Sequence, residues 1–83
     1  MATRKCIETL NEIIHDINTR GDAAIDCDNT QKIYDVILPE FILHYGVDTP
    51  YGLDYGDVHN WIDSLGINCS EYAKDQIYAV LID

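Results

Sequence analysis

The sequence predicts an all-α fold: a small single-domain bundle of four to five short helices with a Gly/Tyr-rich central loop. Three observations support this prediction. Apolar residues recur at helical spacing in several segments, glycine or proline ends or interrupts those segments, and 47% of the 83 residues are hydrophobic, as is ordinary for a folded protein. A chain this short has room for one core, and it shows no internal repeat and no long linker, so residues 1–83 are expected to form one domain.

The first predicted helix has the clearest boundaries. Thr3 is a suitable N-cap, and Arg20 followed by Gly21 supplies the signals that end a helix. The apolar residues between them recur at helical spacing: Ile7, Leu10, Ile13, Ile14 and Ile17. The opposite face carries carboxylates four residues apart, which repel one another mildly and would gain from facing a cation: Glu8, Glu12 and Asp16.

Two further helical pieces are predicted before the middle of the chain. Residues 22–28 allow either a short helix or a tight passage, and we predict the helix. An amphipathic pattern then starts at Asn29 or Thr30, and Pro39 suits either the first turn of a new short helix or a kink. The apolar residues of this pattern are Ile33, Val36, Ile37, Phe41 and Ile42. Gly46 is expected to end it.

The central loop, residues 46–56, has no helical period and separates the two helical halves. Its glycines permit positive φ, and Pro50 restricts its own backbone and that of Thr49, so the segment must turn several times at the surface. It carries two tyrosines and two aspartates: Tyr51, Tyr55, Asp48 and Asp54. The loop is therefore either a contact loop or a connector whose tyrosines fold back onto the core.

Two helices are predicted after the loop. Asp57 is expected to open the first and Gly66 to close it. Its apolar residues are Val58, Trp61, Ile62 and Leu65. Ser70 is expected to cap the last helix, and the buried stripe of that helix is predicted to contain Tyr72, Ala73, Ile77, Val80 and Leu81.

The charge of the chain is strongly acidic, because fifteen Asp and Glu against five Lys and Arg give a formal net charge of −10. Direct binding to nucleic acid or to an anionic membrane is not expected, since both are negatively charged. No Lys or Arg occurs from Ile33 to Ala73, although seven carboxylates do: Asp35, Glu40, Asp48, Asp54, Asp57, Asp63 and Glu71. They form either a solvated face that keeps a small protein soluble or a surface that meets a basic partner.

Cysteine usage and hydropathy indicate a cytoplasmic setting. Cys6, Cys27 and Cys69 are odd in number and widely spaced, without a CxxC motif, so neither a disulfide framework nor a zinc site is expected. The N-terminus does not resemble a signal peptide, and no apolar run approaches the length needed to span a bilayer. We therefore expect a cytoplasmic protein without a membrane partner.

Two short motifs invite a ligand-binding interpretation. Residues 20–22, Arg-Gly-Asp, spell the tripeptide that integrins recognise, but that interpretation needs an extracellular protein, and a helix C-cap explains the residues better. Residues 26–37 resemble the start of an EF-hand calcium loop. Gln31 stands where that family has the glycine of the sharp turn, and Ile37 stands where it has the bidentate glutamate. No metal or other cofactor is therefore expected.

A third motif, Asp63-Ser64-Leu65, is similar to the core around the phosphopantetheine-bearing serine of acyl carrier proteins, which are also acidic helical domains of about this length. The resemblance implies a prosthetic group on Ser64. In that family the serine begins a helix and a glycine lies two residues before it. Here Ser64 lies late in a predicted helix, and Ile62 occupies the glycine position.

Residues 58–81 resemble a helix-turn-helix or the opening of a SAM interaction domain, because Gly66 joins two amphipathic helices. The second helix would present Glu71, Asp75 and Gln76 with only Lys74 basic, which disfavours the major groove of DNA. If this corner makes a contact, we expect the contact to be with protein.

No catalytic constellation is visible in the sequence. His15, His44 and His59 are isolated from one another. The stretch Asp57-Val58-His59, near Cys69, could hold a thiol–imidazole pair of His59 and Cys69, but neither a nucleophile elbow nor a glycine-rich phosphate loop accompanies it. We therefore expect a protein that is not an enzyme.

The leading hypothesis is a non-enzymatic inhibitor or adaptor that presents carboxylates and tyrosines to a basic, nucleic-acid-handling protein. Carboxylates at helical and loop spacings can imitate the repeated charge of a phosphate backbone. In size and charge the chain is similar to the phage-encoded DNA-mimic antirestriction and anti-CRISPR proteins. The residues expected to bind the partner are Asp48, Tyr51, Asp54, Tyr55 and Asp57, with Asp35, Glu40 and Asp63 as a supporting field. Changing Asp54 and Asp57 to lysine is expected to abolish binding and to leave helicity intact.

The alternative hypothesis is a self-associating structural or regulatory module whose aromatic surface builds a small homo-oligomer. Sedimentation separates the two hypotheses, because an inhibitor can be monomeric and an oligomer cannot. High net charge disfavours close packing of like subunits, which ranks self-association second. An acyl-carrier-like protein ranks third.

Overall fold

A computed structural model describes residues 3–82 and confirms the predicted all-α bundle, with no strand in this part of the chain. There are four helical segments. The first is α1 (Arg4–Arg20) and the second is a continuous run made of α2 (Cys27–Lys32), a π-helical turn (Ile33–Ile37) and α3 (Leu38–Tyr45). The third and fourth are α4 (Tyr55–Ser64) and α5 (Glu71–Ile82), and a short 3₁₀ turn (Gly21–Ala24) follows α1.

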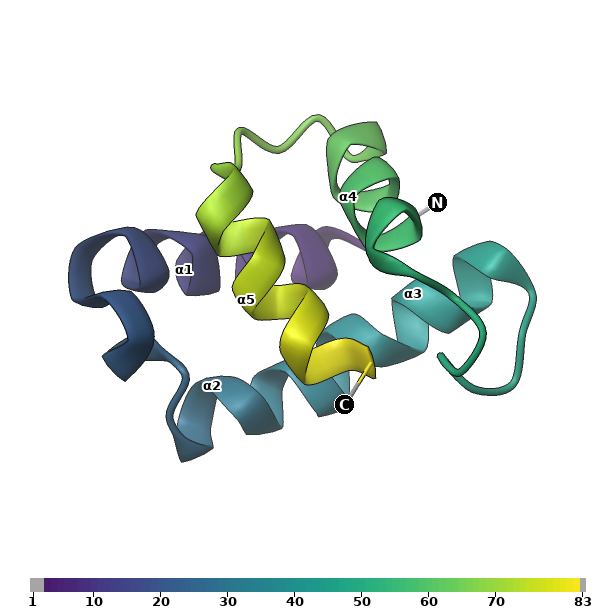
Figure 1. The fold of residues 1–83 in the computed structure, drawn as a ribbon, viewed down its shortest axis with the longest axis horizontal. Helices are drawn as coiled ribbons and strands as arrows, with labels where there is room; N and C mark the ends of the chain where they lie inside the picture. The colour runs from purple at the N-terminus through teal and green to yellow at the C-terminus, as the bar shows by residue number, and fades with distance from the viewer. Residues whose placement is uncertain (1–2, 83) are drawn as a thin grey trace.

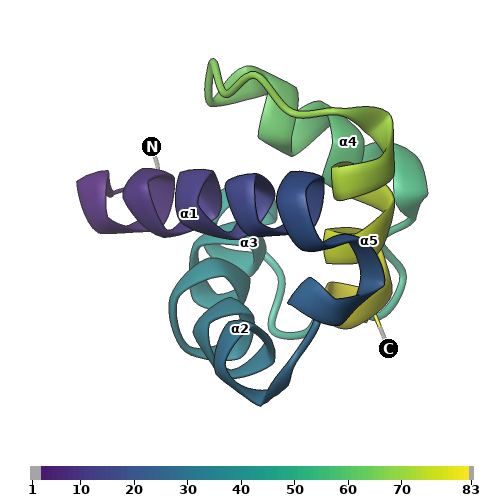
Figure 2. The ribbon, with the colours of Figure 1, turned by 90° about the vertical axis from the view of Figure 1, so that its left-hand side faces the viewer.

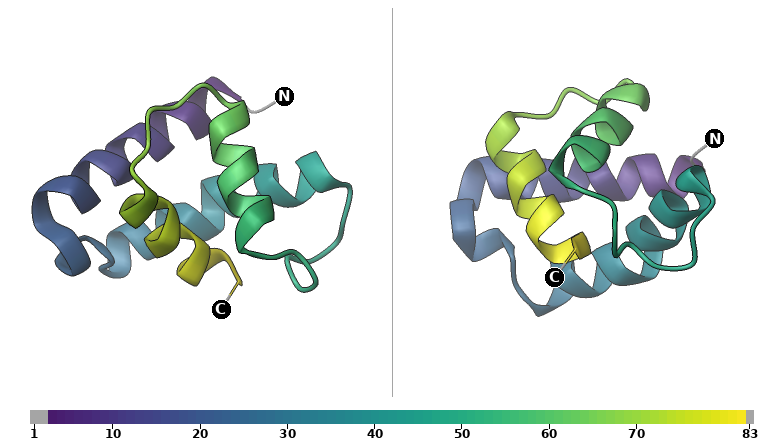
Figure 3. Two further views of the ribbon diagram at one scale, coloured as in Figure 1. Left: turned by 45° about the horizontal axis from the view of Figure 1, so that its top comes forward. Right: turned by 45° about the vertical axis from the view of Figure 1, so that its right-hand side comes forward.

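The helices surround one core. Figure 1 shows α5 crossing α1 and the π-helical turn, with α4 beside it, and these elements are in contact. Seen from the side, α1 lies between α4 and the run from α2 to α3 (Figure 2). The loop between α3 and α4 projects at the edge of the molecule in both views of Figure 3. None of the helices within residues 3–82 has the length and apolarity needed to cross a membrane.

Helix α1 has the predicted boundaries. The Thr3 hydroxyl accepts a hydrogen bond from the backbone N–H of Cys6 at 3.2 Å, and Gly21 ends the helix with φ +63°. Each of the three carboxylates on its outer face forms an ion pair with a Lys or Arg side chain. Arg4 pairs with Glu8, Arg20 with Asp16, and Lys32 with Glu12 at 2.9, 3.1 and 4.0 Å respectively. The charge repulsion predicted along this face is therefore offset within the molecule.

Helix α2 begins at Cys27, two or three residues before the predicted start at Asn29 or Thr30. The Asp26 carboxylate caps it by accepting from the backbone N–H of Asn29 at 2.9 Å. The predicted helix over residues 22–28 is only partly right, because Ile25 and Asp26 break it between the 3₁₀ turn and α2. The buried Asn29 amide secures this corner by donating to the Ala24 carbonyl and to the Asp16 carboxylate at 2.7 and 2.8 Å.

Pro39 lies in the first turn of α3, which the sequence allowed. Proline offers no N–H and its ring crowds the carbonyl four residues earlier. The chain accommodates this with the π-helical turn just before it, in which the Leu38 N–H donates to the Ile33 carbonyl five residues back. The helix therefore continues through Pro39, and Gly46 ends it with a left-handed φ of +68° as predicted.

Helix α4 begins at Tyr55 rather than at Asp57. Asp54 is its N-cap, so the central loop without helical structure spans residues 46–54. The predicted start at Asp57 is wrong because both Asp54 and Asp57 are suitable caps, and each accepts a hydrogen bond from the backbone N–H of the other. Gly66 follows the helix with φ +73°, as expected at this position.

Helix α5 is capped by Ser70, whose hydroxyl accepts from the N–H of Ala73 at 3.2 Å, as predicted. One residue of its predicted buried stripe is misplaced. Tyr72 is 44% exposed, and its hydroxyl donates to the Asp22 carboxylate beside the 3₁₀ turn. Tyrosine satisfies both a helical apolar pattern and a surface hydrogen bond, so the pattern alone could not distinguish them.

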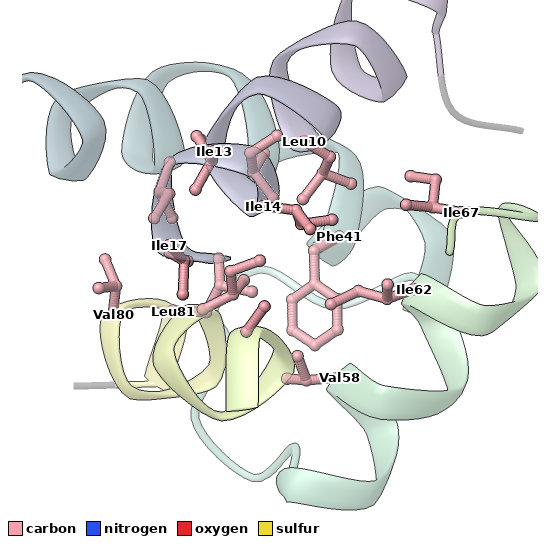
Figure 4. Close-up of a cluster of buried hydrophobic side chains, with 14 of the residues drawn as sticks. Leu10, Ile13, Ile14, Ile17, Phe41, Val58, Ile62, Ile67, Val80 and Leu81 are labelled. Atoms are coloured by element: carbon pink, nitrogen blue, oxygen red, sulfur yellow. The ribbon is translucent and has the colours of Figure 1, made fainter. Parts of the chain in front are cut away.

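The core is built from all four helical segments. Phe41 is fully buried and its ring meets the Trp61 ring edge-on, with 5.2 Å between the ring centroids. Figure 4 shows the Phe41 side chain pointing toward Val58 and Ile62 of α4. Most of the other buried apolar side chains belong to α1, α2–α3 and α5, and these include Leu10, Ile13, Ile17, Ile33, Ile37, Ile77 and Leu81. Ala24 of the 3₁₀ turn and Ile67 between α4 and α5 are buried as well.

Candidate protein-binding surface

The loop between α3 and α4 is held at its base. The Tyr45 hydroxyl, near the end of α3, donates to the Asp57 carbonyl in the first turn of α4 at 2.7 Å. The Tyr45 ring packs edge-on against the buried Phe41 ring, with 5.3 Å between centroids. Burial, followed by the charges of Asp57 and Asp54, raises the pKa of the Tyr45 hydroxyl, which therefore remains a donor at neutral pH. The two ends of the loop are thus fixed to the core.

Asp54 and Asp57 form a reciprocal capping box at the start of α4. The Asp54 carboxylate accepts from the Asp57 N–H at 3.1 Å, and the Asp57 carboxylate accepts from the Asp54 N–H at 2.9 Å. The N-terminal end of a helix carries a partial positive charge, which favours carboxylates there. Both aspartates therefore have a structural role in addition to the binding role predicted for them.

A seam of polar and aromatic side chains joins α4 to α5. Its contacts run along Tyr55, His59 and Asp63 of α4, which are spaced four residues apart. The Tyr55 hydroxyl donates to Glu71 at 3.2 Å, and His59 Nε2 lies 3.1 Å from an Asp75 carboxylate oxygen. Asp63 accepts from Lys74, and the Tyr55 ring lies on the His59 ring with 3.8 Å between centroids.

The seam changes the acidity of Tyr55. The nearby Asp75 carboxylate is the main cause, followed by partial burial and by the Glu71 carboxylate, which accepts from the hydroxyl; together they raise the pKa of Tyr55. The folded chain therefore holds this proton more tightly than the unfolded chain, in which a tyrosine has a pKa of about 10. The stabilisation is complete below about pH 10 and is lost as the pH rises through the folded pKa.

Replacing Tyr55 with phenylalanine should therefore flatten the alkaline part of the stability profile. We expect the free energy of unfolding in urea to fall between about pH 10 and 12 more steeply for the natural chain than for Tyr55→Phe. Tyr51→Phe is the matched control, because the Tyr51 hydroxyl forms no hydrogen bond within residues 3–82 and its ring is 74% exposed. Equal slopes for the natural chain and Tyr55→Phe would contradict this account of the seam.

Six of the eight residues predicted to bind a partner lie along the loop, α4 and its seam with α5: Asp48, Tyr51, Asp54, Tyr55, Asp57 and Asp63. The other two lie beside basic residues. Glu40 accepts from the Thr3 N–H at 2.9 Å, next to Arg4 and Lys5 at the start of α1. Asp35 lines a groove of about 460 Å³ between α1 and α2, together with Lys5 and Lys32.

Some candidate residues of this surface were not among those expected from the sequence to bind the partner. Glu71 and Asp75 join it from α5, and their spacing of four marks a helical stripe, but only the tertiary structure shows that this stripe faces α4. Leu43 and Val47 lie at the end of α3 and the start of the loop, and they are 71% and 37% exposed. The exposure of Leu43 could have been predicted, because its position does not match the helical spacing of the buried residues Ile37 and Phe41.

We define the acidic surface as the six loop and α4 residues together with Glu71 and Asp75. Within residues 3–82, Lys74 is the only Lys or Arg that forms an ion pair with it. The Lys74 side chain is 13% exposed and contacts Asp63, so it presents little positive charge to solvent. Arg4, Lys5, Arg20 and Lys32 all belong to α1 and α2. The cations and the acidic surface are therefore segregated.

Three observations describe the groups near this surface that could take part in catalysis or metal binding. No group of three or more His, Cys, Asp and Glu side chains within the described part of the chain could hold a metal ion. Burial raises the pKa of the Cys69 thiol, which disfavours the thiolate form that a nucleophile needs. Ser64 is the last residue of α4, and its hydroxyl donates to the Trp61 carbonyl at 2.6 Å.

Comparison of the chain with protein-family models, with curated proteins and with solved structures gives no match. A functional interpretation therefore depends on the surface itself.

Proposed function

We propose that this chain is a non-enzymatic inhibitor or adaptor that presents its acidic surface to a basic, nucleic-acid-handling protein. The observation that carries the proposal is the segregation of charge. The formal net charge is −10, and no Lys or Arg occurs between Ile33 and Ala73. The cation paired with the acidic surface, Lys74, is largely covered. A surface of this kind attracts a basic partner over a distance and speeds association.

The chemistry of the surface suits a site that normally binds a phosphate backbone. Its carboxylates come from a loop and two helices, and Asp48 forms no ion pair with any other residue between 3 and 82. Lysines and arginines that bind phosphates can bind carboxylates in the same way. Such an inhibitor would compete with nucleic acid, as the DNA-mimic antirestriction and anti-CRISPR proteins do.

Self-association is the second candidate, and the exposure of Leu43 and Tyr51 favours it. These side chains could pair with those of a second copy. Two surfaces that both carry this charge repel each other at low salt, however, so an oligomer of this kind should become more stable as salt is added. A complex with a basic partner should show the opposite dependence.

The proposal is tested by capture from a candidate host lysate on immobilised protein, with the bound proteins identified by mass spectrometry. We expect a basic nucleic-acid-handling protein that is released by roughly 0.5 M salt and by competing DNA. Capture that survives both treatments, or capture of no basic protein, would contradict the proposal. Sedimentation of the chain alone at low and high salt tests self-association in the same experiment series.

A further inference from the structure

We infer that the exposed apolar side chains Leu43, Val47 and Tyr51 form an anchor that enters an apolar pocket on the basic partner, with the pocket bordered by Lys or Arg. This inference rests on the proposed function and adds to it the part of the surface that holds the complex together. The acidic surface then sets the rate of association with the partner, and the anchor sets the rate of dissociation.

The anchor consists of the three most prominent apolar side chains of one short segment. Leu43 is 71% exposed and Tyr51 is 74% exposed, more than any other large apolar side chain in the described chain, and Val47 lies between them in sequence. Exposing such groups without a partner is unfavourable, since each loses burial that the core gives to similar residues. Tyrosine is also enriched among residues that dominate binding energy.

The structure holds the anchor in place before any partner arrives. Gly46 turns the chain with a left-handed φ, and the Val47 N–H then donates to the Ile42 carbonyl at 3.1 Å. On the far side of the anchor, the Leu53 N–H donates to the Pro50 carbonyl at 3.1 Å, and the half-buried Leu53 packs against the core. A fixed loop loses less conformational entropy on binding than a mobile one, which favours slow dissociation.

Charge complementarity identifies the occupant. Asp48 lies within the anchor segment and Asp54 follows it, and the segment from Leu43 to Asp57 contains no Lys or Arg. An apolar pocket with an acidic border would repel this segment, and a pocket with a basic border would attract it. A second copy of this chain offers only the acidic kind of border around the same loop, so a basic partner fits better than self-association.

The test uses the full chain, the captured basic partner, and binding kinetics measured over a range of salt concentrations. Leu43→Ser with Tyr51→Ser is the test variant, and Tyr34→Ser is the control, because Tyr34 is exposed on the π-helical turn, outside the anchor. We expect the test variant to dissociate at least about tenfold faster and to associate at a rate within about twofold of the natural chain at each salt concentration. The control should match the natural chain in both rates.

The possible outcomes separate the two proposals. If the natural chain binds the basic partner and the test variant dissociates no faster, the anchor inference is wrong and the proposed function stands. If no basic protein binds the natural chain, the proposed function fails and the anchor inference fails with it. A dimer of the natural chain that disappears in the test variant would assign the anchor to a second copy and overturn the inference. Circular dichroism confirms that the variants fold.

Discussion

Replacing Phe41 with alanine is expected to remove much of the stability of this protein. Phe41 is fully buried, and its ring contacts those of Trp61 and Tyr45 at centroid distances of 5.2 and 5.3 Å. Truncating a buried phenylalanine costs about 3–5 kcal/mol, and a domain of this length has a free energy of unfolding of roughly 4–12 kcal/mol. The loss also frees Tyr45, whose hydroxyl fixes the base of the loop.

Urea denaturation followed by far-UV circular dichroism measures this effect. Leu43→Ala is the matched control, because Leu43 lies two residues away on the same helix and is largely exposed. We expect the control to change the free energy of unfolding by less than about 0.5–1 kcal/mol. Similar losses for the two variants would mean that the Phe41 cluster does not organise the core.

Changing both Asp54 and Asp57 to lysine is expected to destabilise the protein by about 2 kcal/mol. The double change removes both side-chain acceptors of the capping box and places positive charge at a helix N-terminus, where it is unfavourable. Thermal unfolding should therefore begin at a lower temperature, with loss of helical signal from α4. Asp54→Asn with Asp57→Asn separates the two causes, since it removes the charges and keeps the acceptors.

We expect the asparagine variant to retain most of the stability that the lysine variant loses. Equal stability of the lysine variant and the natural chain would show that the capping box contributes little. The sequence predicted that the two lysines leave helicity intact, and the capping box in the structure leads us to expect a loss of helicity instead.

A test of partner binding needs carboxylates that do not cap a helix with their side chains, and Asp48 and Glu71 meet this condition.

Most of the helical architecture could be predicted because local signals and tertiary structure agree. Thr3, Gly21, Gly46, Gly66 and Ser70 act at the positions where their chemistry suggested. Each acts through its own backbone or through groups within a few residues, so the sequence nearby contains the required information. The same is true of the buried stripe of α1.

The errors arose where two residues could do the same task or where the partner lies far along the chain. Asp54 and Asp57 are equivalent as caps until the reciprocal bonds are seen. Tyr72 bonds to Asp22, fifty residues earlier, and no local pattern reveals such a partner. Pro39 allowed either a new helix or a kink, and the π-helical turn before it is the local adjustment that the structure uses.

The candidate surface was predictable in part for the same reasons. The absence of Lys and Arg over residues 33–73 is visible in the sequence, and it drew attention to the loop and α4. The sequence could not show that Glu40 lies beside the start of α1, or that Asp35 lines a groove together with Lys5. Lys32 is close to Asp35 in the sequence, but folding is needed to bring Lys5 to the same groove.

The central claim is that the acidic surface, and not the net charge alone, binds a basic partner. The most direct test compares two variants with the same change in charge: Asp48→Asn with Glu71→Gln on the acidic surface, and Glu8→Gln with Glu12→Gln on α1, where cations already pair. Association rates with the captured partner are measured at low salt. We expect the first variant to associate at least about fivefold more slowly and the second to stay within about twofold of the natural chain. Equal slowing of both variants, or slowing of neither, would contradict the claim.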